Sequence, residues 1–158
     1  MDEMINYFEV FGLPVQYAID LKELRLKYYA LSRDTHPDLH QNKDSFSTKP
    51  DSALVNMAYK ALSDKHSRLK CVLQHLQVIK DQEKYQLDPI FLVEMMEWNE
   101  AIDQGKVHVL DELKQIASDL FEIIVAKLNQ QTLSTSDKNE LKEKYYKLFS
   151  LERMLERT

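Results

Sequence analysis

The sequence predicts an all-α protein built from two helical modules. Its 158 residues include only two Gly and four Pro, so residues that interrupt helices are scarce. Apolar residues recur three or four positions apart in most of the long segments, which is the spacing of a helix with one buried face. Because the chain is 44% hydrophobic and 30% charged, it has enough apolar residues for a packed core and is not expected to be disordered.

The amino-terminal module is expected to start with a short helix followed by a long one. Residues 6–12 predict the short helix, which ends at Gly12. Asp20 is in position to cap the next helix, and Glu23 to complete a capping box. The segment from Leu21 to Thr35 then predicts a long helix with an apolar face and, roughly opposite, a basic face. The apolar face holds Leu21, Leu24, Tyr28 and Leu31, and the basic face holds Lys22, Arg25 and Arg33 with Tyr29 among them.

The turn after this helix contains the sequence His36-Pro37-Asp38. Pro37 disfavours the α conformation for His36, so the helix should stop there and display an imidazole and a carboxylate at the start of a polar loop. In isolation the tripeptide is most simply a helix stop, and a basic helix face is most often a solvated surface. Together they place a positive surface beside a displayed turn, which suits the docking of an acidic partner.

Two more helices should complete this module. Residues 51–64 predict a helix whose apolar face packs antiparallel against the first long helix, and residues 68–80 predict the next one. The loop at residues 39–50 is longer than this packing requires, and such loops are often functional. The polar, aperiodic residues 81–87 indicate a boundary. We therefore expect one module at residues 1–75, a connecting segment at 76–87 and a second module at 88–158.

The second module should begin with a helix that is apolar on two sides. Asp88 and Pro89 are favourable first residues, and Gly105 ends the helix. One stripe, suited to a core, consists of Phe91, Met95, Trp98 and Ile102. The other side carries Leu92, Val93 and Met96 near the acidic residues Glu97, Glu100 and Asp103. Full burial is disfavoured because unpaired buried charge is costly, so this side predicts an exposed apolar patch with an acidic rim, a protein-interaction surface. Core packing remains the alternative for each apolar residue singly.

Two long helices should complete a three-helix bundle. Residues 106–129 predict one, and residues 138–157 predict the other, with Asp137 and Glu140 placed as a capping box. Short connections between the three helices favour antiparallel packing.

Several classes of function are disfavoured by composition. The formal net charge of −5 argues against a general nucleic-acid binder, and no apolar stretch approaches the length of a membrane span. The single Cys71 forms no internal disulfide, and no secretory signal precedes the first helix, so an intracellular protein is expected. His36 and His40 have helical metal-pair spacing, but Pro37 lies between them. We expect no catalytic site, no metal site and no cofactor.

The amino-terminal half resembles a J-domain. The resemblance rests on residues 7–14 (Tyr-Phe-Glu-Val-Phe-Gly-Leu-Pro), the basic helix, His36-Pro37-Asp38, and the following helix with Asn56, Ala58 and Tyr59. A J-domain followed by a small helical bundle that opens with Phe91-Leu92-Val93-Glu94-Met95-Met96-Glu97 is similar to the HscB family, bacterial co-chaperones of iron–sulfur cluster assembly. The resemblance covers essentially the whole chain. It implies a J-domain made of an antiparallel helical hairpin with short helices, followed by a three-helix bundle.

The resemblance also implies partners and roles. The J-domain would dock an HscA-type ATPase chaperone of the heat-shock protein 70 family and stimulate its ATP hydrolysis through His36, Pro37 and Asp38. The basic helix would assist through Arg25, Lys22, Tyr29 and Arg33. The bundle would bind the IscU-type cluster scaffold through Leu92, Val93, Met96, Glu97, Glu100 and Phe149. The chain departs from the family pattern at two places, which bear on affinity and not on function. The family often has an acidic residue where this chain has Gln104, and Phe149 lies near the expected place of an aromatic residue of the last helix, with Ser150 beside it. A bacterial cytoplasmic protein, favoured as a monomer and not itself an enzyme, is implied.

Three other functions are weighed against this one. A general J-domain co-chaperone for other clients would leave the Leu92, Val93 and Met96 surface without a scaffold partner. A helical nucleic-acid binder would use Lys22, Arg25 and Arg33, against the acidic net charge. A small enzyme would need a site that the sequence does not offer.

Overall fold

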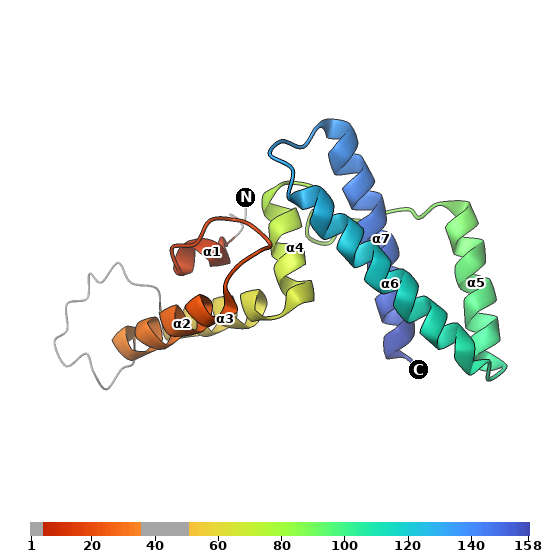
Figure 1. The fold of residues 1–158 in the computed structure, drawn as a ribbon, viewed down its shortest axis with the longest axis horizontal. Helices are drawn as coiled ribbons and strands as arrows, with labels where there is room; N and C mark the ends of the chain where they lie inside the picture. Colours follow the sequence, from red (N-terminus) through yellow and green to blue (C-terminus); the bar gives the residue numbers. More distant parts are fainter. Residues whose placement is uncertain (1–4, 36–50) are drawn as a thin grey trace. The chain divides into compact units, whose positions relative to one another are not determined.

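The computed structural model describes residues 5–35 and 51–158, and all regular secondary structure within these ranges is helical (Figure 1). The all-α prediction is therefore confirmed for the described residues. The chain divides into two compact units, Met1–Gln77 and Val78–Thr158. No helix in the described ranges is both long and apolar enough to cross a membrane.

The first unit begins with the short helix α1 (Tyr7–Val10) and the long helix α2 (Leu21–Thr35). The Asn6 side chain caps α1 by accepting the backbone N–H groups of Phe8 and Glu9. Gly12 follows with a φ of 63°, a left-handed conformation that suits glycine. Asp20 caps α2 as expected, because its carboxylate accepts the backbone N–H of Lys22 at 2.9 Å.

A helical hairpin of α2 and α3 (Ser52–Ser63) holds the core of this unit (Figure 1). Tyr28 of α2 stacks on Tyr59 of α3 with ring centroids 4.1 Å apart, and its hydroxyl donates to Asn56 Oδ1 at 2.7 Å. The residues whose side chains are fully buried here are Phe8, Leu24, Val55, Ala58 and Leu62. The antiparallel packing expected from the two apolar faces is therefore present.

Helix α4 spans Lys65–His75, so the prediction of a helix over residues 68–80 was wrong at both ends. It starts earlier because the Asp64 carboxylate caps it, accepting the Ser67 N–H at 2.9 Å. It stops earlier at a turn in which Gln77 has a φ of 60°. Val78 and Ile79 are nevertheless buried, which explains why their apolar spacing extended the helical pattern.

One charged residue belongs to the core of the first unit. Arg68 on α4 is only 7% exposed. Its guanidinium donates to the Leu62 carbonyl at 2.8 Å and lies over the Tyr17 ring, 4.6 Å from the centroid. Arg68 therefore connects α4 to the end of α3 and to the loop before α2, and these contacts stabilise the packing of α4 against the hairpin.

The second unit contains α5 (Pro89–Asp103), α6 (Val107–Leu128) and α7 (Thr135–Glu156), as the expected three-helix arrangement requires (Figure 1). Its core lies mainly between α6 and α7, where the fully buried side chains are Leu113, Ile124, Leu141 and Leu151, with Leu148 nearly so. Helix α5 buries only Phe91 by comparison. Most of the surface of α5 therefore remains available to solvent.

The start of α7 differs from the prediction. The helix begins at Thr135, three residues earlier than expected, because Ser134 and Asp137 form the capping box. Asp137 N–H donates to Ser134 Oγ at 3.1 Å, and Ser134 N–H donates to Asp137 Oδ2 at 2.9 Å. Asp137 and Glu140, the predicted box, instead both contact Lys127 Nζ at the end of α6, at 3.0 and 3.1 Å. The backbone N–H of Ser134 and the ammonium of Lys127 lower the pKa of Asp137 to about 2.

The segment before α5 packs on α7. Glu83 pairs with Lys142 and accepts the Tyr146 hydroxyl at 2.9 Å. The Tyr85 ring stacks on the Tyr146 ring with centroids 4.6 Å apart. The hydrogen bond from Lys142 lowers the pKa of Glu83, and burial together with the Glu83 carboxylate raises the pKa of Tyr146. Glu83 and Tyr85 therefore attach the segment before α5 to α7.

Candidate functional site

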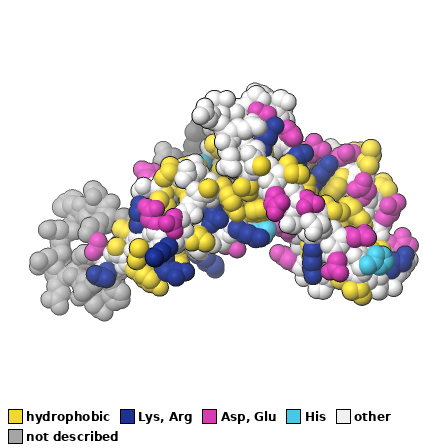
Figure 2. Space-filling model, in the orientation of Figure 1, with side chains coloured by type: hydrophobic (Ala, Val, Ile, Leu, Met, Phe, Trp, Pro, Cys, Tyr) yellow, Lys and Arg dark blue, Asp and Glu magenta, His cyan; other side chains and the backbone are white. Residues whose placement is uncertain are grey.

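The first candidate surface is the basic face of α2. Lys22, Arg25 and Arg33 are exposed, and the Tyr29 side chain is 57% exposed. Leu24 is fully buried on the opposite side of the helix, which fixes the basic face toward solvent. Figure 2 shows Lys and Arg side chains gathered over the α2 and α3 region. His36, Pro37 and Asp38 lie outside the described residues, so their part in this surface stays a prediction.

One residue of this surface was missed by the sequence reasoning. Leu26 is 62% exposed although it is a large apolar side chain. Leu26 is four residues from Lys22, three from Tyr29 and seven from Arg33. At helical spacing it therefore lies in the middle of the basic face. Helical spacing alone places Leu26 on this face, but the prediction considered only its charged residues and Tyr29. An exposed leucine among cations adds an apolar contact point to an otherwise electrostatic surface.

A neighbouring cation is already engaged. Lys27 Nζ donates to the Phe11 carbonyl at 3.1 Å and lies 3.3 Å from Glu23 Oε1. The Glu23 backbone N–H donates to Asp20 Oδ1 at 3.3 Å, as in a capping box, and its side chain pairs with Lys27. Lys27 ties α2 to the end of α1 and belongs to the scaffold of the unit.

The second candidate surface is the outer side of α5. Met96 is 71% exposed, Val93 54% and Leu92 42%, and Glu97 and Glu100 are exposed beside them. The inner stripe packs differently: Phe91 is buried and meets Trp98 edge to face, with ring centroids 6.0 Å apart. The two apolar sides deduced from periodicity are thus separated, one packed and one open to solvent with acidic neighbours. Asp88 and Pro89 start the helix as predicted, and the Asp88 carboxylate accepts the Ile90 N–H at 2.9 Å.

Phe149 of α7, the last residue predicted for scaffold binding, is also exposed. Its side chain is 43% exposed and packs on Tyr145, with ring centroids 6.3 Å apart. The Arg153 guanidinium lies over the Phe149 ring, 5.7 Å from the centroid. Arg153 also lines a pocket whose opposite wall is on α5, so Phe149 lies at the edge of the place where α5 and α7 meet.

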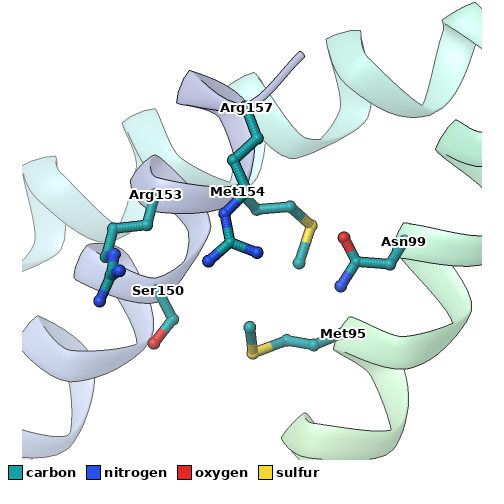
Figure 3. Close-up of a pocket in the computed structure, with 6 residues that line it drawn as sticks. All are labelled: Met95, Asn99, Ser150, Arg153, Met154 and Arg157. Atoms are coloured by element: carbon teal, nitrogen blue, oxygen red, sulfur yellow. The ribbon is translucent and has the colours of Figure 1, made fainter.

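That pocket has a volume of about 130 Å³ (Figure 3). Met95 and Asn99 reach into it from α5, and the residues from α7 are Ser150, Arg153, Met154 and Arg157. Lys147 of α7 lies over the Phe91 ring, 5.4 Å from the centroid, which holds the two helices together beyond the pocket. Sequence reasoning missed these pocket residues, because periodicity assigns a residue to a face and does not say which face of another helix it meets.

The chemistry of both surfaces is that of protein recognition. Within residues 5–35 and 51–158, no three His, Cys, Asp or Glu side chains cluster as metal ligands. Cys71 is half-buried, and burial raises the pKa of its thiol, which disfavours the reactive thiolate. What the described residues offer is a basic helix face with one exposed leucine, and an apolar, acid-rimmed helix face beside a small pocket.

Two protein-family models match the chain. The model described as the DnaJ domain matches residues 6–71, and the model described as the HSCB C-terminal oligomerisation domain matches residues 87–157. The first match contains the basic face of α2, and the second contains the exposed side of α5 and the pocket. Together the two models account for most of the chain.

Individual proteins agree with these matches. The co-chaperone protein HscB homolog of Haemophilus ducreyi is 30% identical over 157 residues, and the alignment covers 91% of each chain. The iron–sulfur cluster co-chaperone protein HscB homolog of Arabidopsis thaliana is 33% identical over 108 residues, covering 66% of this chain and 43% of the plant protein. The solved structure of chaperone HscB from Vibrio cholerae matches with a TM-score of 0.64 and 26% identity, over 97% of this chain and 96% of that one. The chain spans about 60% of the length of two curated Vibrio relatives that it matches.

Proposed function

The chain belongs to the HscB family, J-domain co-chaperones of iron–sulfur cluster assembly, and on this basis we propose a specific adaptor function for it. It binds an IscU-type scaffold protein, delivers it to an HscA-type chaperone of the heat-shock protein 70 family and stimulates ATP hydrolysis by that chaperone. The bacterial relatives favour the cytoplasm of a bacterium as its location.

The observation that supports this proposal most directly is the exposed side of α5. Leu92, Val93 and Met96 are large apolar side chains left open to water within the segment that matches the HscB family model. Glu97 and Glu100 border them, so a partner with an apolar patch and basic neighbours fits this side. Phe149 of α7 is also exposed, and we assign it to the same binding surface.

The chaperone contact is assigned to the first unit. His36, Pro37 and Asp38 carry the J-domain signature in sequence, and Lys22, Arg25, Tyr29 and Arg33 give the adjacent helix its exposed basic face. An acidic surface on the ATPase would be attracted to this face at long range, which raises the rate of encounter. Leu26 adds an apolar contact at its centre.

The mechanism requires no bond chemistry by this chain. A partner accelerates an ATPase only by binding one of its states more tightly than another, so the J-domain must favour the hydrolysis-competent state. The scaffold bound to the second unit raises the effective concentration of the J-domain at the same chaperone. A weak J-domain contact is then sufficient.

The experiment that tests the chaperone role is an ATPase assay with a purified HscA-type chaperone. We expect the wild type to stimulate hydrolysis and His36→Gln to lose most of that stimulation. His108→Gln, a substitution of an exposed histidine on α6, is the matched control and should stimulate like the wild type. If the wild type gives no stimulation, the chaperone role is wrong. If His36→Gln stimulates equally, the role of His36 is wrong.

A separate experiment tests the scaffold role. Purified IscU-type scaffold is titrated with the wild type, and the dissociation constant is measured by calorimetry. A chain that stimulates the chaperone but does not bind the scaffold would be a general J-domain co-chaperone for other clients.

A further inference from the structure

We propose that the pocket between α5 and α7 receives a carboxylate side chain of the scaffold protein, which Arg153 and Arg157 bind. This inference rests on the proposed scaffold binding and specifies its chemistry. It adds to the apolar, acid-rimmed side of α5 a second contact of opposite charge on α7. The scaffold segment that docks here would therefore need an acidic residue on the side that faces α7.

The pocket is built for a short apolar stem with a charged end. Met95 and Met154 supply its apolar walls, and Met154 is only 4% exposed. Figure 3 shows Arg157 extending past Met154 toward the space between the helices, with Met95 and Asn99 reaching in from α5. A volume of about 130 Å³ accommodates a side chain such as that of glutamate, whose methylene groups would contact the two methionines.

The polar groups of the pocket are mainly hydrogen-bond donors. Each guanidinium presents N–H groups in a planar fork that matches a carboxylate, and the Asn99 amide adds further donors. The Ser150 hydroxyl already donates to the Tyr146 carbonyl at 2.8 Å, so its hydrogen is not available to a ligand. A group that only accepts hydrogen bonds and carries negative charge is the complement of this set.

The two arginines differ from four lysines of the second unit that are already paired. Lys127, Lys142, Lys144 and Lys147 each contact a carboxylate at the distance of an ion pair. Within the part of the chain that the structure describes, neither Arg153 nor Arg157 has a carboxylate partner, and the Arg153 guanidinium instead lies over the Phe149 ring. Two unpaired guanidinium groups at one pocket attract a carboxylate of a partner, and Arg153 connects that contact to the apolar surface.

The distribution of charge across the surface favours one orientation of the bound scaffold segment. Helix α5 carries Glu94, Glu97, Glu100 and Asp103 and no Lys or Arg. The pocket on the α7 side carries the two arginines. A scaffold segment seated over Leu92 and Met96 would meet negative charge on one side and positive charge on the other. A segment bound in the reverse orientation would place like charges together, which costs affinity.

The test measures the scaffold dissociation constant by calorimetry for the full-length wild type and for Arg153→Gln/Arg157→Gln. We expect about tenfold weaker binding by the variant at low salt, with the difference shrinking as salt increases, because the pocket is open to solvent. Arg157→Gln alone separates the charge effect from the packing of Arg153 on Phe149, and should also weaken binding. Lys114→Gln removes an exposed cation of α6 outside this surface and should bind like the wild type.

The outcomes separate this inference from the proposal on which it rests. If the wild type binds the scaffold and the arginine variants bind with an unchanged or lower dissociation constant, the carboxylate contact is wrong and scaffold binding stands. If the wild type does not bind, both are wrong. Where the wild type binds and the arginine variants bind more weakly, a second experiment identifies the carboxylate. Each acidic residue of the scaffold is changed to its amide, and each such scaffold variant is titrated with the wild type and with Arg157→Gln. At least one pair should show a combined loss smaller than the sum of the single losses, and additive losses at every acidic position would overturn the inference.

Discussion

Truncating two large apolar side chains on the exposed side of α5 should weaken scaffold binding without unfolding the protein. The variant is Leu92→Ala/Met96→Ala. Both side chains are substantially exposed in the free protein, so a partner that covers them removes apolar surface from water. Leu92 is more than half covered in the free protein and Met96 much less, so the free energy of unfolding should fall by about 1–2.5 kcal/mol, which leaves the unit folded.

The size of the binding effect follows from how much of each side chain is exposed. Fully burying a Leu or Met side chain is worth about 1.5–3 kcal/mol. Met96 is 71% exposed and Leu92 42%, so docking removes at most those fractions from water. Scaled in this way, Met96 contributes about 1–2 kcal/mol and Leu92 about 0.6–1.3 kcal/mol. The double variant should therefore lose about 1.6–3.3 kcal/mol of binding free energy, roughly a 15- to 250-fold higher dissociation constant.

The assay is calorimetric titration with purified scaffold, accompanied by urea denaturation of each variant. Ile123→Ala on α6 is the matched control, because Ile123 is 48% exposed and lies outside α5 and α7. The control should bind like the wild type. A double variant that is folded and binds as tightly as the wild type would show that scaffold docking does not use this side of α5.

Three predictions concern the stability of the second unit, each measured as the free energy of unfolding in urea. Leu113→Ala removes a fully buried side chain from α6 and should cost about 2–5 kcal/mol, and a cost below 1 kcal/mol would contradict its place in the core. Ser134→Ala removes the hydroxyl that accepts the Asp137 N–H and should cost about 1 kcal/mol, whereas Ser134→Thr should largely retain the cap. Asp137 has a pKa of about 2 in the folded protein and an ordinary value of 3.8, so its contribution is complete above the ordinary value and is lost as the pH falls toward 2. In Asp137→Asn this part of the acid sensitivity should be absent, and an unchanged loss of stability between about pH 5 and pH 2 would argue against it.

The helices were largely predictable because their signals are local. The bounds of α2 were predicted from an N-cap at Asp20 and a proline after the helix, both of which act within one turn. The two apolar sides of α5 followed from spacing alone, and the structure separates them as expected. The errors occurred where two local signals competed. At α7, both Ser134 with Asp137 and Asp137 with Glu140 have capping-box character, and only the backbone shows which pair is used.

The end of α4 was missed for a different reason. Buried apolar residues continue to Ile79, but they follow a turn at Gln77 instead of extending the helix. Periodicity reports burial, and burial in an extended segment resembles burial on a helix over so short a stretch. The left-handed conformation of Gln77 has no marker in the sequence, since glycine and asparagine are the usual signals for it.

The candidate surfaces were predictable only in part. Exposed apolar residues on α5 could be inferred because charges share their helix. The pocket could not, because it depends on which side of α7 meets Met95 and Asn99. That is a property of packing between helices separated by some fifty residues in the chain, on which short-range spacing carries no information. The His36-Pro37-Asp38 turn remains an inference from sequence.

The packing of residues before α5 on α7 matters for anyone who divides this chain into fragments. The family match to the second module begins at residue 87, and a fragment cut there would lack Glu83 and Tyr85. Lys142 would lose its carboxylate and the Tyr146 ring would lose its stacking partner, although neither residue lies near the cut in sequence. A fragment or chimera that begins at Val78 would keep both contacts. The compact unit that contains this bundle is therefore longer than the segment that the family model matches.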